Sequence, residues 1–273
     1  MCRLYALRAS HPTRVGRELI ESQNSLMAQS RRDETGAPNP DGWGVGYWLD
    51  GRSWCLKQAH PASESPQFRA KAGMIKGLTV LGHVRRATAG APALCNTHPF
   101  SDGDAMLAHN GHLGAFATIR ALMTDAMSAR QRAALHGDTD SEHFFRLLMS
   151  MHEADASPGP VELLRRAVQQ VTAWSRGTDG QAEVGLNIFW TLGARLAGAR
   201  LGRSLWYVER HEPHIDEITG VPDAVVPKGE SYRSVVLASE RITDEDWRAV
   251  PEASVFEVDD RIRMRVEPLL SAG

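Results

Sequence analysis

The chain has 273 residues, 42% of them hydrophobic, and a formal net charge of −2, which suits one large domain or two small ones. Acidic and basic residues are interspersed, so the sequence lacks the basic footprint of a protein that binds nucleic acid or an anionic membrane. No apolar run approaches the ~20 residues of a membrane span, and the N-terminal segment lacks the apolar core of a signal peptide. We therefore expect a cytoplasmic protein.

The cysteines and histidines give no sign of a disulfide framework or a metal site. Cys2, Cys55 and Cys95 are too few and too scattered for disulfides, and no CxxC pair suggests zinc. His109 and His112 form an HxxH, which is not the HExxH spacing of a helical zinc site. We expect no metal.

The first half of the chain is expected to contain mostly strands. In order, the sequence predicts a strand at 2–8, a helix at 13–26, a polar loop at 31–42, strands at 42–49 and 53–59, a helix at 64–76, and strands at 78–86 and 104–109. Asp50-Gly51, between two apolar runs, is a strong hairpin signal.

The second half is expected to contain a block of helices and then a block of strands. Helices are predicted at 113–124, 140–153 and 160–175, and strands at 184–192, 204–210, 234–239, 254–260 and 261–268. Pro160 is well placed for a first helical turn. The order lacks βαβα alternation, so it favours antiparallel sheets under helical layers. No Pro- or Ser-rich linker divides the chain, and we expect one domain over 1–273.

Two stretches near the middle of the strand-rich half are unusual. DGWGVGY at 41–47 has alternate glycines that let the backbone approach another group closely, although a turn with a flexible strand also explains it. In GHVRRATAG at 82–90, Arg85 ends a strand and Thr88 follows three residues later, an arrangement that can clamp a carboxylate. A solvated surface strand is an equally good explanation.

Two later stretches offer polar groups for binding. NTHPF at 96–100 is followed by AHNGHL at 108–113, in which Asn110-Gly111 is a turn signal and also offers the two donors of an oxyanion hole. In GDTDSEHFF, Asp140 or Ser141 is expected to cap the helix that follows. A carboxylate there can also bind an ammonium group.

Cys2, directly after the initiator methionine, is by position alone typical of a small apolar residue that begins a strand. The alternative is a nucleophile that becomes N-terminal when Met1 is removed. A terminal thiol, a carboxylate clamp, an oxyanion pair and an ammonium-binding carboxylate are together the parts that hold an α-amino acid by its head and attack a carbonyl in its side chain. The combination favours the nucleophile.

At these residues the sequence resembles the class II glutamine amidotransferases of the N-terminal-nucleophile hydrolase superfamily. Six motifs occur in the family's order within residues 1–150: MCRLYAL, DGWGVGY, GHVRRAT, NTHPF, AHNG and TDSE. ASE at 238–240, with Trp247 and Pro251, resembles the family's C-terminal part. The similarity is greatest to the stand-alone branch, which includes the glutathione-degrading amidotransferase subunit of fungi and the amidohydrolase of ergothioneine synthesis.

The resemblance implies an α+β fold, a four-layer α/β/β/α sandwich of two mostly antiparallel sheets, and no cofactor. It also implies that Cys2 is the nucleophile after Met1 is removed and that the free α-amine is the general base. An α-amine has an ordinary pKa near 8 and can accept a proton near neutral pH. Asn110 and Gly111 are implied as the oxyanion hole of an amidohydrolase that acts on glutamine or a γ-glutamyl amide.

The substrate's head group is implied to be bound by Arg85, with Thr88 nearby, at its α-carboxylate and by Asp140 at its α-ammonium. The large biosynthetic members usually have Trp after the clamp arginine and His after the threonine, whereas this chain has Arg86 and Ala89. Free glutamine is therefore less certain as the substrate. The family's ASEP is ASER here.

Two other hypotheses remain open. The chain lacks the second domain that uses ammonia in the biosynthetic members, so it can be a subunit that is active only with a partner enzyme, or it can form a homo-oligomer. The other hypothesis is a metallohydrolase using His83, His98, His109 and His112. Four histidines on separate strands have no recognisable ligand spacing, which disfavours it.

Overall fold

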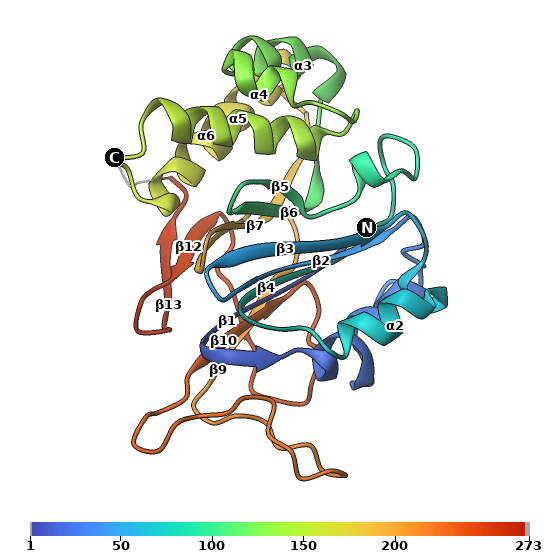
Figure 1. Ribbon diagram of the computed structural model, residues 1–273. Coiled ribbons are helices and arrows are strands. Elements are labelled where there is room, and N and C mark those ends of the chain that lie inside the picture. The colour runs from blue at the N-terminus through green and yellow to red at the C-terminus, as the bar shows by residue number, and fades with distance from the viewer. Residues whose placement is uncertain (1, 271–273) are drawn as a thin grey trace.

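The computed structural model describes residues 2–270 and contains two antiparallel sheets packed face to face between layers of helix (Figure 1). In spatial order the first sheet contains β11 (Arg248–Ala249), β9 (Trp206–Arg210), β10 (Ser234–Ala238), β1 (Arg3–Arg14), β4 (Lys76–Val84), β2 (Trp43–Leu49) and β3 (Arg52–Gln58). The second contains β13 (Met264–Pro268), β12 (Ser254–Val258), β8 (Arg195–Arg200), β7 (Val184–Leu192), β6 (Ala105–Leu113) and β5 (Phe100–Asp102). The predicted α+β sandwich is confirmed.

Helices cover the outer face of each sheet. The first sheet carries the π-helical turn η1 (Arg17–Glu21), α1 (Leu26–Arg31), the 3₁₀ turn η2 (Ala62–Glu64) and α2 (Pro66–Ala72); a further 3₁₀ turn, η3 (Leu94–Asn96), lies in the loop before β5. The second sheet carries α3 (Phe116–Asp125), α4 (Ala129–Ala133), α5 (Asp140–Ala154) and α6 (Pro160–Thr178), seen above it in Figure 1. No helix within residues 2–270 is long and apolar enough to cross a membrane.

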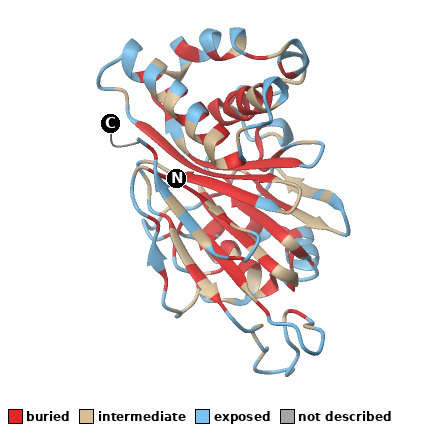
Figure 2. Ribbon diagram, turned by 90° about the vertical axis from the view of Figure 1, so that its left-hand side faces the viewer, coloured by how far each residue is buried: buried red, intermediate tan, exposed pale blue. Residues whose placement is uncertain are grey.

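Alternation along β1 shows how the sequence builds the layers. Leu4 and Ala6 belong to the buried cluster between the two sheets. Tyr5 and Leu7 belong to the cluster between the first sheet and its helices. Because successive strand residues point to opposite faces, a strand buried on both faces is apolar along its whole length. Figure 2 shows long buried stretches, in red, along the central strands, and β10 is buried over its whole length.

The alternate glycines of β2 allow the two sheets to approach each other. A Cβ atom on Gly44 would lie 1.9 Å from the carbonyl oxygen of His98, and one on Gly46 would lie 2.5 Å from Met106 Sδ. Any larger residue at Gly44 would therefore overlap backbone that leads into the second sheet. The close approach that the sequence predicted is present, and the group that approaches is the protein's own chain.

The single helix predicted at 13–26 is wrong. β1 continues to Arg14, where Thr13 and Arg14 pair with β4 beyond an irregularity in the register. The rest of the segment forms two separate helical pieces, η1 and α1. Ser25 caps the start of α1, because its hydroxyl accepts the N–H of Ala28 at 3.3 Å. Strands β5, β8 and β11 and helix α4 were not predicted.

Candidate active site

The Cys2 thiol lies against the backbone just after β4. Its Sγ accepts a hydrogen bond from the N–H of Arg86 and can donate to the Arg86 carbonyl, both at 3.3 Å. Arg3 pairs with Val84 in the sheet, so the chain leaving β4 has to pass beside Cys2. The half-buried thiol is thus held by the segment that follows the GHVRR motif.

Charges from two other motifs act on the same sulfur. Burial raises the pKa of the Cys2 thiol; the Arg86 N–H and the positive charge of Arg85 lower it, and the negative charge of Asp140 raises it again, so that its pKa stays above the ordinary value. Arg85 and Asp140 therefore lie close enough to influence the thiol. The structure brings together three of the residues that the sequence predicted for the site.

Arg85 is buried and its guanidinium is fixed by the loop that follows it. It donates to the carbonyl oxygens of Ala89, Gly90 and Ala91 at 2.7, 3.1 and 3.2 Å. The solvated-strand explanation is wrong for this residue, since only 3% of it is exposed. Thr88 is exposed, and no residue of the described part of the chain bonds to its hydroxyl.

Asp41 and Asn96 hold the neighbouring loops. Asp41 accepts the N–H of Ala87 at 2.7 Å on its carboxylate. Asn96 of the NTHPF motif donates to the Ala91 carbonyl at 3.1 Å and accepts the N–H of Asp138 at 3.2 Å. One amide side chain thus ties the loop that holds Arg85 to the segment leading into α5. A carboxylate at position 41 and an amide at position 96 supply the acceptors and the donor that these bonds need. The sequence alone did not predict these bonds.

Asp140 is the first residue of α5 and is buried. One carboxylate oxygen accepts the N–H of Leu113 at 2.8 Å, and the other accepts the N–H of Ser141 at 2.8 Å. The expectation that Asp140 or Ser141 caps α5 is wrong: Thr139 has the extended backbone of a cap and accepts the N–H of Glu142 at 3.1 Å. Asp140 is consequently free of the cap position and faces β6.

Asn110 and Gly111 lie within β6, so their turn interpretation is wrong. A Cβ on Gly111 would lie 1.9 Å from the carbonyl oxygen of Gly185 on β7, which only glycine allows. The Asn110 amide is buried, and its nitrogen lies 3.4 Å from Ser239 Oγ. The same hydroxyl accepts the N–H of Leu4 at 2.9 Å. Ser239 therefore links the strand of Cys2 to the strand of Asn110.

Arg3 anchors the start of the chain. Its guanidinium donates to the Cys2 carbonyl at 3.0 Å, forms an ion pair with Asp33 at 3.0 Å, and contacts Glu240 in a second ion pair. All three charged residues are buried. The sequence did not single out Arg3 or Asp33, because their partners lie far along the chain. Glu240 lies in the ASE segment that carried part of the resemblance.

The profile of the class-II glutamine amidotransferases matches residues 1–262. The chain belongs to this family. It is an amide-bond hydrolase of the glutamine amidotransferase type.

Solved structures of family members have the same fold. A glutamine aminotransferase class-II domain protein from Silicibacter pomeroyi matches 98% of this chain and 99% of its own with a TM-score of 0.65 and 20% sequence identity. The glutamine phosphoribosylpyrophosphate amidotransferase of Bacillus subtilis has a TM-score of 0.65 and 15% identity, over 99% of this chain. The match covers 50% of the B. subtilis chain.

Curated relatives include two γ-glutamyl-hercynylcysteine sulfoxide hydrolases. The protein from Mycolicibacterium smegmatis is 26% identical over 278 residues, which cover 95% of this chain and 96% of the relative. The protein from Mycobacterium tuberculosis is 38% identical over 100 residues, 34% of this chain and 42% of the relative. This chain is therefore similar over almost its whole length to a γ-glutamyl-hercynylcysteine sulfoxide hydrolase.

Three of the four histidines of the metallohydrolase hypothesis lie near one another in this amidotransferase, although the His109 ring bonds to Ser141 of α5 on the helix-covered face of β6. The ring centroids of His83 and His98 are 4.2 Å apart, and those of His98 and His109 are 6.4 Å apart. Burial lowers the pKa of His83 to about 3 and those of the other two below the ordinary value, so all are neutral at pH 7. Within residues 2–270, no three His, Cys, Asp or Glu side chains are arranged to hold a metal ion.

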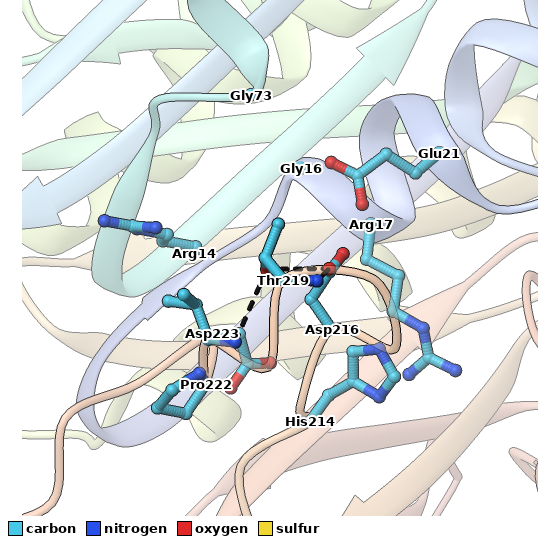
Figure 3. Close-up of a pocket in the computed structure, with 11 residues that line it drawn as sticks. Arg14, Gly16, Arg17, Glu21, Gly73, His214, Asp216, Thr219, Pro222 and Asp223 are labelled. Carbon is cyan, nitrogen blue, oxygen red and sulfur yellow. Dashed lines mark hydrogen bonds between the residues drawn. The ribbon is translucent and has the colours of Figure 1, made fainter.

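A hollow of about 230 Å³ lies away from Cys2, at the ends of β1 and η1 (Figure 3). It is lined by charges of both signs, among them Arg14, Arg17 and Asp223. Figure 3 shows Asp216 hydrogen-bonded to Thr219 on its rim, at 2.6 Å to the N–H and 2.7 Å to the hydroxyl. None of the amidotransferase motif residues predicted for the site lines this hollow.

Arg241 stands where the family's ASEP motif has proline, and its guanidinium packs over the Trp206 ring.

Proposed function

We propose that this amidotransferase hydrolyses the side-chain amide of glutamine or a γ-glutamyl compound through a γ-glutamyl thioester on Cys2, and that residues 1–273 form one glutaminase-type domain. The main support is that a fixed cation, Arg85, and a buried carboxylate, Asp140, both influence the pKa of the Cys2 thiol. An α-amino acid head has one carboxylate and one ammonium. Opposite charges that both act on one nucleophile complement that head.

The reaction follows from these roles. The Cys2 thiolate attacks the side-chain carbonyl, and the negative charge that forms on its oxygen is stabilised by the Asn110 amide and the Gly111 N–H. The carbonyl re-forms, the C–N bond breaks, and ammonia or an amine leaves with a proton. Water then attacks the thioester, and glutamate departs as the thiol is restored. Arg85, with Thr88 at the rim, and Asp140 hold the amino-acid head throughout.

The base is proposed to be the α-amine of Cys2 itself. This requires removal of Met1, because the amine is otherwise part of a peptide bond. A free α-amine titrates near pH 8, so it accepts the thiol proton close to neutral pH. Burial raises the pKa of the Cys2 thiol, so an adjacent base is needed to generate the thiolate.

A γ-glutamyl compound with an amine leaving group is the better-supported substrate. Similarity to the M. smegmatis hydrolase extends over 95% of this chain and 96% of that protein. Arg86 and Ala89 replace residues typical of the glutamine-using biosynthetic members, and Arg86 is exposed beside the thiol. The alternative is a glutaminase-like subunit, active only with a partner enzyme that uses the ammonia or the peptide product.

The test begins with protein whose N-terminal residue is verified as Cys2 by mass. It is incubated with glutamine, γ-glutamyl amides and γ-glutamyl peptides, and released glutamate is measured. We expect release from γ-glutamyl compounds; release from none of them would exclude a self-sufficient hydrolase. Matched protein that retains Met1 is the control and should be inactive. Activity that appears only with a co-purified enzyme would support the subunit alternative.

A further inference from the structure

Ser239 is buried at the end of β10 and touches both parts of the proposed site. Its hydroxyl accepts the Leu4 N–H at 2.9 Å and lies 3.4 Å from the nitrogen of the Asn110 amide. Its backbone N–H donates to the Leu4 carbonyl at 3.0 Å, and its carbonyl accepts the Ser204 hydroxyl at 3.0 Å. Only 1% of the residue is exposed. The hydroxyl is therefore held firmly between the nucleophile strand and β6.

Hydrogen-bond accounting at this hydroxyl favours one orientation of the Asn110 amide. With the amide nitrogen towards Ser239, the hydroxyl oxygen receives two N–H groups, and no residue in 2–270 accepts its own hydrogen. In that orientation Asn110 Oδ1 is buried and has no partner in the described part of the chain. A buried amide oxygen without a donor is unfavourable.

Turning the amide by half a turn pairs the Ser239 hydrogen with Asn110 Oδ1 and leaves Nδ2, in place of Oδ1, at the buried position that faces away from Ser239. The two ends of a carboxamide have nearly the same shape, and the hydrogen-bond partners decide which end is nitrogen. After the turn, the Ser239 hydroxyl still accepts the Leu4 N–H and donates its hydrogen to Asn110 Oδ1. The amide nitrogen then lies on the side away from Ser239.

We propose that Ser239 is a positioning residue that orients Asn110 for catalysis, holding the amide oxygen so that Nδ2 is presented to the substrate oxyanion. This rests on the proposed function, which gives Asn110 its place in the oxyanion hole. An N–H stabilises the charge of the tetrahedral intermediate, whereas an amide oxygen at that point repels it. The same hydroxyl binds Leu4, two residues from Cys2, so it also fixes the spacing between thiol and donor.

The kinetic test compares Ser239→Ala with Ser239→Thr, which keeps a hydroxyl. Ser239→Ala should lower kcat for γ-glutamyl amide hydrolysis at least about 10-fold, towards the ~10²–10³ that loss of an oxyanion donor costs, with a smaller change in KM. Ser239→Thr should restore most of kcat. Alkylation of Cys2 by iodoacetamide, which forms no oxyanion, should keep its rate in Ser239→Ala. Equal losses in alkylation and hydrolysis would show that Ser239 only places the thiol, and would overturn the proposal.

A second measurement needs no substrate and no variant. Neutron diffraction from the ligand-free, deuterium-exchanged protein locates the deuterons of the Asn110 amide directly. Deuterons on the side away from Ser239, with the Ser239 deuteron towards Oδ1, would support the proposal; the reverse arrangement would overturn it. If Cys2-terminated protein hydrolyses no γ-glutamyl compound, the proposed function fails while the neutron result still reports the orientation. The two failures are thus distinguishable.

Discussion

Arg85 and Asp140 act with opposite signs on one sulfur atom, that of Cys2. The positive charge favours the thiolate, and the negative charge favours the thiol. The two residues come from different layers of the fold: Arg85 follows β4 of the first sheet, and Asp140 begins α5, which covers the second sheet. In the proposed function, the charges that hold the amino-acid head of the substrate also set the reactivity of the thiol, and we expect binding of a zwitterionic substrate to shift that balance.

The first prediction concerns this balance in the ligand-free protein. Arg85→Met should move the pH midpoint of Cys2 alkylation up by about 0.5–1 pH unit, and Asp140→Asn should move it down by a similar amount. The measurement is the pH dependence of iodoacetamide labelling, read on the N-terminal peptide by mass spectrometry so that Cys55 and Cys95 do not contribute. Arg85→Lys keeps the charge and should stay near the wild-type midpoint. Shifts of the same sign in Arg85→Met and Asp140→Asn would contradict the assignment.

The second prediction concerns Cys2 itself. Cys2→Ala removes the group that attacks the amide in the proposed reaction and should lower kcat by roughly 10³-fold or more. The side chain is half-buried and, among the described residues, bonds only to the backbone of Arg86, so the melting temperature should change little. Glutamate release and thermal unfolding are measured on the same preparations. Cys95→Ala, at an exposed thiol, is the matched control and should retain full activity.

The layered fold was predictable because its signals are local. Apolar runs such as 42–49 and 184–192, with Asp50-Gly51 between strands, identify β2, β3 and β7 from neighbouring residues alone. The 13–26 helix failed because a register irregularity in β1 and the new cap at Ser25 outweigh helical periodicity. That competition depends on pairing with β4, which lies more than sixty residues away.

Sequence motifs point to Cys2, Arg85 and Asp140 as candidate site residues because each motif carries its own residue. The site was not predictable where the partner comes from the other end of the chain. Arg3 meets Glu240, and Leu4 meets Ser239, across more than two hundred residues. Short polar residues such as Ser239 carry no periodic signal, so only the folded arrangement shows what they hold.

The third prediction concerns the ion pairs that anchor the start of the chain. Burial alone would raise the pKa of Asp33, but hydrogen bonds from Thr35 and the charge of Arg3 outweigh it and hold that pKa below its ordinary value. A depressed pKa contributes stability above about pH 4 that is lost as the pH falls through the folded-state pKa. Asp33→Asn should therefore lower the free energy of unfolding at pH 7 by about 1–3 kcal/mol, since Arg3 retains Glu240. Urea unfolding should show this difference shrinking at low pH.

The matched control for this ion pair is Glu34→Gln, next to it in the same loop. Burial and the charge of Glu240 raise the pKa of Glu34. A raised carboxyl pKa contributes stability at low pH that is lost as the pH rises, so Glu34→Gln should not destabilise at pH 7. If both variants lose the same free energy, the loop's general packing and not the Arg3–Asp33 pair is responsible.

The last prediction concerns Asp223, on the wall of the hollow in Figure 3. Burial and the negative charge of Glu18 raise the pKa of this carboxyl to about 6, against the opposing charge of Arg210, and its Oδ1 has no partner in residues 2–270. The fold therefore favours the protonated form, and that contribution to stability is complete below about pH 4 and is lost as the pH rises through about 6.

Asp223→Asn imitates the protonated carboxyl and should stabilise the protein at pH 8 by about 1–2 kcal/mol, after allowance for partial solvent screening. At pH 4, where the wild-type carboxyl is itself protonated, the difference should vanish. Asp216→Asn on the same loop is the opposite control: hydrogen bonds from Thr219 lower the pKa of Asp216, so its amide variant should destabilise the protein at pH 8. Urea unfolding at both pH values checks the signs, and a stabilisation by Asp223→Asn equal at pH 4 and pH 8 would show that the carboxyl's charge is not its cause.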